Sequence, residues 1–215
     1  MQTRALIITL LLAACGNGGS TPADAGVIDA CNGFVGDPTQ LMDLEVVILD
    51  EEGNITTVAA NDPVPLIRPP QGGRVIFAGI RARHINTCGP VQIIGSLRDG
   101  TQPSDRIVGL DGRPVNLVAS SDGWAESEEP MQLSSYTNVP VCPNAASSRD
   151  IYGELYQLTL GVLDSGNRRG SVSVMVRPFC AEPFNEAACR CICKQGYVLG
   201  DPCPVDPPAP DAGVP

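Results

Sequence analysis

The chain has little of several residue types on which common biochemical functions depend. Its 215 residues include a single histidine, and only 4% of them are aromatic. One histidine excludes a zinc site built mainly from imidazole ligands, and so few rings argue against an aromatic carbohydrate-binding surface. Lys and Arg number 14 against 24 Asp and Glu, a formal net charge of -10. Because an acidic surface repels phosphate backbones, we expect no nucleic-acid partner.

Long apolar runs and helical patterns are also missing. Beyond the N-terminus, no stretch approaches the roughly 18 consecutive apolar residues of a transmembrane helix. No window of about 12 residues repeats its apolar positions with the period of an amphipathic helix. A Gly-x-Ser-x-Gly nucleophile motif is absent as well. These absences argue against a protein that crosses the membrane with helices, against a helical fold and against a serine hydrolase with the Gly-x-Ser-x-Gly motif.

Cysteine, by contrast, is abundant. Nine cysteines in a chain of this size indicate an oxidising compartment, and their odd number leaves one without a partner. The aliphatic content is ordinary for a folded protein, and the length is sufficient for one buried core.

The N-terminal segment accounts for the odd cysteine. Met1–Arg4 carries one positive charge, Ala5–Leu12 is apolar but too short to span a bilayer, and Leu12-Ala13-Ala14-Cys15 follows. This segment resembles a bacterial lipoprotein signal peptide that ends in a lipobox. The resemblance implies lipidation of the Cys15 thiol, cleavage before Cys15 and a membrane partner through the lipid anchor. Because Gly16 rather than Asp follows, the family's sorting rule implies the outer membrane, facing the periplasm or the cell surface.

The mature chain divides by composition. We expect a signal peptide at 1–14, a flexible tether at 15–37, a β-sandwich at 38–179, a cysteine-rich segment at 180–203 and a disordered tail at 204–215. Asp-Ala-Gly-Val occurs in the tether at Asp24–Val27 and again in the tail at Asp211–Val214. Asp-Ala-Gly linkers after a lipobox resemble those of myxobacterial lipoproteins.

Between the tails the apolar residues alternate with the period of a strand. The alternating runs are 42–48, 76–82 and 91–97, followed by 107–110 and 115–118 on either side of a predicted turn at Asp111–Pro114. The runs at 156–162 and 172–176 predict an antiparallel hairpin. So many short strands favour an all-β, immunoglobulin-like antiparallel β-sandwich over a barrel.

The remaining cysteines are disulfide candidates: Cys31, Cys88, Cys142, Cys180, Cys189, Cys191, Cys193 and Cys203. Eight cysteines allow 105 connectivities, of which a Cys88–Cys142 bridge is one hypothesis. Cys191 to Tyr197, followed by Cys203, resembles the C-terminal half of an epidermal-growth-factor-like module, and the resemblance implies a Cys193–Cys203 pair. Because Cys189 lies only one residue before Cys191, a complete module is not expected.

Several residue groups could carry chemistry, and each has a structural alternative. His84 could act as a base, although a histidine leaving a strand is more often a turn residue. Loop carboxylates at Asp50–Glu52 and Glu126–Glu129 could serve a glycosidase or, with Asn54, bind calcium, but solvated turn acids are the ordinary explanation. Trp124 could contact a ligand or lie buried over one end of the sandwich.

These observations favour a non-catalytic, lipid-anchored envelope protein that presents a disulfide-braced sandwich as a binding or structural module, without a cofactor or metal. Two alternatives from other classes stay open. One is a secreted-type hydrolase that uses loop carboxylates. The other is a soft-metal or redox protein that uses Cys189, Cys191 and Cys193 as thiolates.

Overall fold

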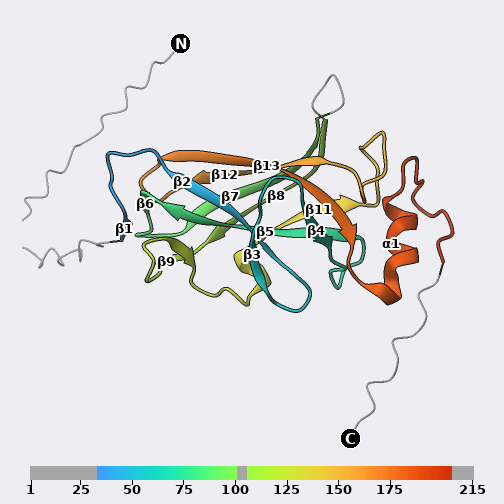
Figure 1. Ribbon diagram of the computed structural model, residues 1–215, viewed down its shortest axis with the longest axis horizontal. Coiled ribbons are helices and arrows are strands. Elements are labelled where there is room, and N and C mark those ends of the chain that lie inside the picture. The colour runs from blue at the N-terminus through green and yellow to red at the C-terminus, as the bar shows by residue number, and fades with distance from the viewer. Residues whose placement is uncertain (1–32, 101–105, 205–215) are drawn as a thin grey trace, which may run out of the picture. The chain divides into compact units, whose positions relative to one another are not determined.

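The computed structural model of the chain describes residues 33–100 and 106–204, which form an all-β unit with one short helix (Figure 1). The first sheet contains β2 (Asp43–Leu49), β3 (Ile55–Thr57), β5 (Arg74–Arg83), β9 (Leu117–Ala119), β10 (Ala125–Ser127) and β11 (Thr137–Cys142). The second contains β4 (Asp62–Leu66), β7 (Val91–Asp99), β8 (Arg106–Val115), β12 (Tyr156–Leu163) and β13 (Arg169–Cys180). The remaining elements are β1 (Phe34–Val35), β6 (Ile85–Asn86), the 3₁₀ turns η1 (Leu133–Ser135) and η2 (Pro183–Asn185), and α1 (Glu186–Cys193).

The prediction of an all-β sandwich followed by a cysteine-rich segment is confirmed. The first sheet has the order β3-β2-β5-β10-β9, with β11 also paired to β5, and the second has the order β4-β13-β12-β7-β8. Neighbouring strands run antiparallel except β4 and β13, which are parallel. The predicted hairpin is β12–β13, in register from Tyr156 opposite Val176 to Leu163 opposite Arg169.

The core lies between the two sheets, on the faces that the alternation predicts. From β5, Ile76 and Ala78 are fully buried, and Ile93 and Leu97 of β7 meet them from the second sheet. Glycine lets the sheets approach closely where β11 crosses the second sheet. A Cβ atom on Gly109 would lie 2.1 Å from the Pro140 carbonyl oxygen, so β8 and β11 could not come this close with any larger residue.

The predicted turn at Asp111–Pro114 is wrong. These residues continue β8 and pair with Gln92–Gly95 of β7. In an Asp-Gly turn the Asp111 carboxylate would accept hydrogen bonds from the backbone of the turn itself. Here it accepts hydrogen bonds from the Asn138 N–H and the Arg113 Nε–H instead. Tertiary pairing along a long neighbouring strand therefore outweighs the local turn propensity of Asp-Gly.

The folded unit begins earlier than composition indicates. β1, at Phe34–Val35, lies within the range 15–37 assigned to the tether and pairs with β6, with Val35 opposite Ile85. Val35 retains only 8% of its exposure because it joins the main core. Two apolar residues are too few to give a periodic signal, which explains why the sequence pattern misses this strand.

The helix α1 organises the cysteine-rich segment at one end of the sandwich (Figure 1). Cys189 and Cys193 are four residues apart on it, so they share a face, and both are buried. Cys193 is joined to Cys142 at the end of β11, and Cys189 to Cys180 at the end of β13. Cys191, on the other side of the helix, is joined to Cys203.

Two predicted pairings are therefore wrong. Cys193 does not pair with Cys203, and Cys142 does not pair with Cys88, although Cys88 is itself disulfide-bonded. The reason is the helix, since it points Cys193 into the protein and leaves Cys191 beside the chain that returns to Cys203. Cys31 and Cys15 lie outside the described residues.

The disulfides should differ in what they stabilise. Replacing Cys142 and Cys193 by Ala opens a loop of 51 residues and should cost about 4 kcal/mol of unfolding free energy by the chain-entropy relation. Replacing Cys191 and Cys203 opens a loop of 12 residues and should cost about 3 kcal/mol at most. Urea unfolding of both double variants measures the difference; a smaller loss for Cys142–Cys193 than for Cys191–Cys203 would contradict this role.

Candidate functional site

His84 holds a turn and is not placed as a catalytic base. It has a positive φ of 56°, and its Nδ1 accepts a hydrogen bond of 2.9 Å from the Asp37 N–H. Its carbonyl oxygen accepts a hydrogen bond from Arg168. Both ring and backbone therefore tie the β1 region to neighbouring loops, which is the structural role that sequence reasoning left open.

A cluster of charges surrounds Arg81 on the outer face of β5. Its guanidinium contacts Glu45 of β2 at 3.2 Å and Glu126 of β10 at 2.6 Å, and it also pairs with Asp122 of the β9–β10 turn. Glu45 lies directly opposite Arg81 in the β2–β5 register. Half-exposed carboxylates from three elements thus share one cation, an arrangement that holds the β9–β10 turn against the sheet.

Trp124 lies buried beside this cluster, which settles its position in favour of packing. The Arg81 and Arg83 guanidinium carbons lie 5.0 and 4.2 Å from the centre of its ring. Only 7% of the residue is exposed. Cation–π contacts of this kind favour a fixed ring over one free to stack on a sugar.

A gap in the first sheet opens next to the cluster. On one edge of β5, β10 pairs only at Ala82, and β11 begins pairing at Ala78. Within the described residues, the part of β5 between these two pairings therefore has a partner strand on one edge only. On that edge it pairs with β2 through Gly79, Ile80 and Arg81. The chain between β10 and β11 leaves the sheet here and returns through η1.

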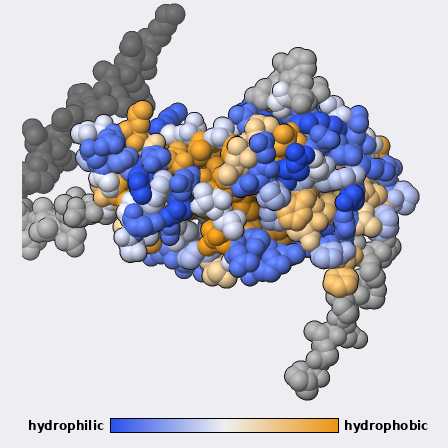
Figure 2. Space-filling model, viewed as in Figure 1, coloured by the Kyte–Doolittle hydropathy of each residue, from blue (hydrophilic) through white to orange (hydrophobic). Residues whose placement is uncertain are grey.

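The gap holds a pocket of about 280 Å³, named here the split pocket. Its floor consists of core side chains from four strands, and its rim of charged and polar groups. The floor residues are Ile80, Ile93, Val115 and Leu117, and the rim includes Arg81, Glu126, Ser127 and Tyr136. In Figure 2, apolar residues form a band in the middle of the visible face, where β3 and β5 are labelled in Figure 1.

Two hydroxyl groups of the split pocket differ in their bonding. The Tyr136 hydroxyl donates to the Pro130 carbonyl oxygen at 2.8 Å, and its ring packs so closely on Gly79 that a Cβ there would lie 2.8 Å from it. Ser127 Oγ, in contrast, is shielded from water and has no hydrogen-bond partner among the described residues. An unsatisfied buried hydroxyl costs about 1–3 kcal/mol, so the chain carries a destabilising group at this position.

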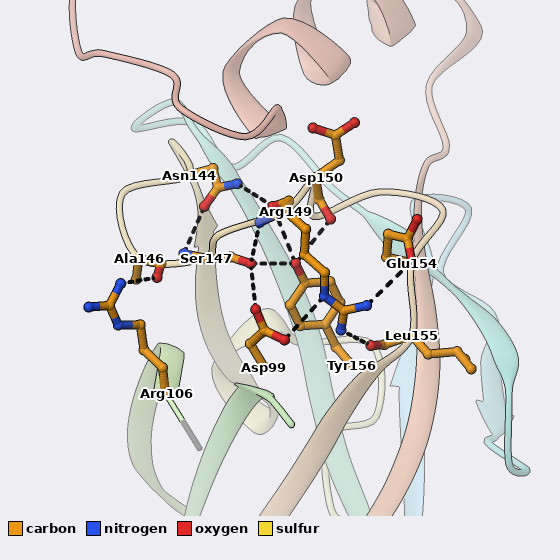
Figure 3. Close-up of polar contacts among 10 residues, drawn as sticks. All are labelled: Asp99, Arg106, Asn144, Ala146, Ser147, Arg149, Asp150, Glu154, Leu155 and Tyr156. Carbon is orange, nitrogen blue, oxygen red and sulfur yellow. Dashed lines mark hydrogen bonds and ion pairs between the residues drawn. The ribbon is translucent and has the colours of Figure 1, made fainter. Parts of the chain in front are cut away.

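A second polar cluster lies near α1, at the loop that follows β11 (Figure 3). Asp99, fully buried, accepts hydrogen bonds from Ser147 Oγ at 3.0 Å and from Arg149 Nε at 3.1 Å. Ser147 Oγ also lies 2.6 Å from the Tyr156 hydroxyl, which donates to the Asp150 carbonyl oxygen. The guanidinium of Arg149 lies 4.5 Å from the Tyr156 ring.

The Asp99 cluster is suited to fixing the loop rather than to catalysis. No histidine or lysine contacts Ser147 in it, and both oxygens of the Asp99 carboxylate are occupied. Burial raises the pKa of Tyr156, so its hydroxyl stays protonated at neutral pH. Asn144 extends the network to the Cys193 carbonyl oxygen, which links the loop to the helix that carries the disulfides.

The other predicted groups do not assemble into a site. Asp50 accepts two hydrogen bonds from Asn54 and closes the β2–β3 turn, while Glu128 and Glu129 are exposed. Within residues 33–100 and 106–204, no three His, Cys, Asp or Glu side chains are placed to hold a metal ion. Cys189, Cys191 and Cys193 are all in disulfides and so are not thiolate ligands in this state.

Sequence reasoning missed the residues that the fold brings together in the split pocket. Neither Arg81 nor Ser127 belongs to a sequence pattern that indicates a functional site. Their juxtaposition depends on where β10 and β11 leave β5, for which the local sequence carries no signal. No family model, curated protein or solved structure matches the chain.

Asp99→Ala tests the second cluster. Removing one partner of a fully buried ion pair costs roughly 3–5 kcal/mol, and we expect about 2–3 kcal/mol here because Arg149 retains 22% exposure. The exposed Glu52→Ala is the control and should change the unfolding free energy by about 0.5 kcal/mol or less. Equal effects in urea unfolding would show that the cluster does not fix the loop.

The raised pKa of Tyr136 predicts that the folded state loses stability at alkaline pH. Burial, with a smaller contribution from the Glu126 charge, raises the pKa of Tyr136 to about 12, above its ordinary value of 10.0. The group therefore contributes stability below pH 10, and this contribution is lost as the pH rises toward about 12. The difference between ultraviolet titrations of the wild type and Tyr136→Phe gives this transition, and a midpoint at 10.0 would contradict the burial.

Proposed function

We propose that the protein is a lipid-anchored, non-catalytic envelope lipoprotein whose β-sandwich binds a ligand at the split pocket. Cys15 carries the anchor, the outer membrane is the location, and the following tether holds the folded unit away from the bilayer. The observation that carries the binding role is the split pocket itself, a concave apolar floor with a few convergent polar groups.

The disulfides support the proposal that the protein is exported from the cytoplasm. Three of them join cysteines of the described residues, and Cys88 is also bonded, which is the pattern of proteins in oxidising compartments. Among the helices that the structure describes, none is long and apolar enough to cross a bilayer. A lipid on Cys15 supplies membrane attachment through buried acyl carbons, at about 0.8 kcal/mol for each.

The two alternative functions have less support. A glycosidase needs two facing carboxyl groups, one with a raised pKa. Burial, with a contribution from the Glu52 charge, raises the pKa of Glu51, but its neighbour Asp50 is engaged by Asn54 in closing the β2–β3 turn. Glu126, at the split pocket, is paired with Arg81 at 2.6 Å. A thiolate site would require reduction of the disulfides that hold α1.

Cys15→Ala tests the anchor. We expect the variant to take up no palmitate and to be released or retained as an unprocessed precursor, because the acylated thiol is missing. Metabolic palmitate labelling, membrane fractionation and intact mass before and after reduction measure acylation and disulfides together.

Ser20→Ala, a change within the tether, is the matched control and should be labelled like the wild type. Labelling of Cys15→Ala equal to that of the control would refute lipidation at this residue.

A further inference from the structure

We infer that Cys31 forms a disulfide with Cys88, which bonds the end of the tether to the sandwich and leaves Cys15 as the cysteine that carries the lipid. The pairing follows from the folded unit and from the number of cysteines. The statement about Cys15 rests on the proposed function.

The number of cysteines narrows the partner of Cys88 to two residues. Nine cysteines are present in the sequence, and six of them pair with one another in the three disulfides described above. Cys88 is disulfide-bonded as well. Cys15 and Cys31 are the two cysteines that remain, so one of them is its partner within the chain.

The pairing of β1 with β6 brings the chain that precedes β1 toward Cys88. The two strands pair in an antiparallel register, and the Gly33 carbonyl oxygen continues it by accepting hydrogen bonds of 2.6 Å from both the N–H and the hydroxyl of Thr87. Cys88 follows Thr87 directly, and Cys31 precedes Gly33 by two residues. Two residues of extended chain span about 7 Å, and a disulfide joins Cα atoms about 4.4–6.8 Å apart. Cys31 can therefore reach Cys88 while β1 and β6 stay paired.

Hydrogen bonds hold the turn that contains Cys88 against the sandwich. The Cys88 N–H donates to Asn86 Oδ1 at 2.9 Å, and the Asn86 N–H donates to the Asp164 carboxylate at 3.1 Å. Ser165 Oγ donates to the Asn86 carbonyl oxygen at 3.1 Å. A turn held in this way keeps Cys88 close to the chain that enters β1, so the order that a disulfide requires on this side is already present.

Loop closure favours Cys31 over Cys15 as the partner. Both residues precede Gly33, but a far longer segment separates Cys15 from it. Because the entropy lost on closing a loop grows with its length, the effective concentration at Cys88 is on the order of tenfold lower for Cys15 than for Cys31. A lipid on the Cys15 sulfur, as proposed above, removes that thiol altogether.

The bond forms by thiol–disulfide exchange with a disulfide-bearing oxidant of the oxidising compartment. The thiolate of one cysteine attacks the oxidant and forms a mixed disulfide, from which the second thiolate displaces the oxidant's sulfur. The S–S bond between Cys31 and Cys88 forms, and the oxidant takes up two electrons and two protons and leaves as a dithiol.

The position of the bond suits an attachment point. β1 is only two residues long, and its described contacts include the Phe34 ring, 5.3 Å from the Arg168 guanidinium carbon, and the buried Val35. A covalent bond beside so short a strand keeps it paired with β6 when the membrane anchor pulls on the tether. Stretching between the lipid and the sandwich is then confined to residues 16–30.

Peptide mapping of the protein purified from membranes tests the pairing. Free thiols are blocked with N-ethylmaleimide, and the unreduced chain is cleaved in urea with trypsin and with a protease that cuts before aspartate. These cuts place Cys15, Cys31 and Cys88 on separate peptides, which are 15–23, 29–36 and 84–98. We expect the peptides of Cys31 and Cys88 to be joined by a bond that reduction breaks, and the peptide of Cys15 to be acylated.

Single variants test the same pairing through thiol counts in urea without reductant. Cys31→Ala should expose one thiol per chain, at Cys88, whereas the wild type and Cys15→Ala should expose none. Asn32→Ala, which alters the neighbouring residue and keeps every cysteine, is the matched control and should expose none. The double variant Cys31→Ala/Cys88→Ala should melt about 10 °C below the wild type, because the loop that contains β1 to β6 is no longer closed.

A bond between the Cys15 and Cys88 peptides, maleimide on Cys31 in the wild type, or an exposed Cys88 thiol in Cys15→Ala would each overturn the pairing. An unchanged melting temperature of the double variant would contradict the attachment role. If Cys31 carries maleimide while Cys15 carries acyl chains, the pairing falls and the anchor stands. If the Cys31 and Cys88 peptides are joined while Cys15 carries maleimide, the anchor falls and the pairing stands.

Discussion

The change of partner along one edge of β5 is the constraint on which the site depends. A strand edge can pair with only one neighbour at a time, and here β10 takes Ala82 while β11 takes Ala78. The residues between them keep a strand on the β2 side and face a gap on the other. Because the floor of the gap is the core itself, the pocket is lined by core side chains that stay buried, Ile93 completely so.

Closely approaching backbones and disulfides keep this arrangement in place. Gly79 lets the Tyr136 ring pack directly on β5, and Gly109 lets β8 meet β11 at Pro140. At its other end β11 finishes at Cys142, which is bonded to Cys193 of α1. The strand that forms one side of the gap is thus held at both ends, so the pocket belongs to a rigid part of the fold rather than to a loose loop.

Polar residues in the structure fall into two groups with different consequences. Around Asp99 each buried polar atom that the network uses has a partner, and such a satisfied network stabilises a single loop conformation. Ser127 Oγ has none among the described residues, and natural proteins accept such a cost chiefly at functional positions. Arg83 Nε and Asn138 Oδ1 share this property outside the pocket, so the pocket itself distinguishes the candidate site from the scaffold.

The alternation of apolar residues was enough to predict the sandwich, the β12–β13 hairpin and the inward faces of β5 and β7, because strand periodicity records which side is buried. It could not predict that Asp111–Pro114 continue β8, since that depends on pairing with a distant strand. The alternation did not predict the short helix α1 either. It therefore could not predict that Cys189 and Cys193, four residues apart on that helix, are both buried.

The sequence by itself determined the all-β class, the cysteine-rich end and the residues available for chemistry, since these follow from composition and local period. Only the tertiary structure decided which cysteines meet and which polar groups share a pocket. Arg81, Glu126 and Ser127 come together because β5 changes partners between Ala78 and Ala82. Partner choice is a long-range packing outcome, to which no short stretch of sequence corresponds.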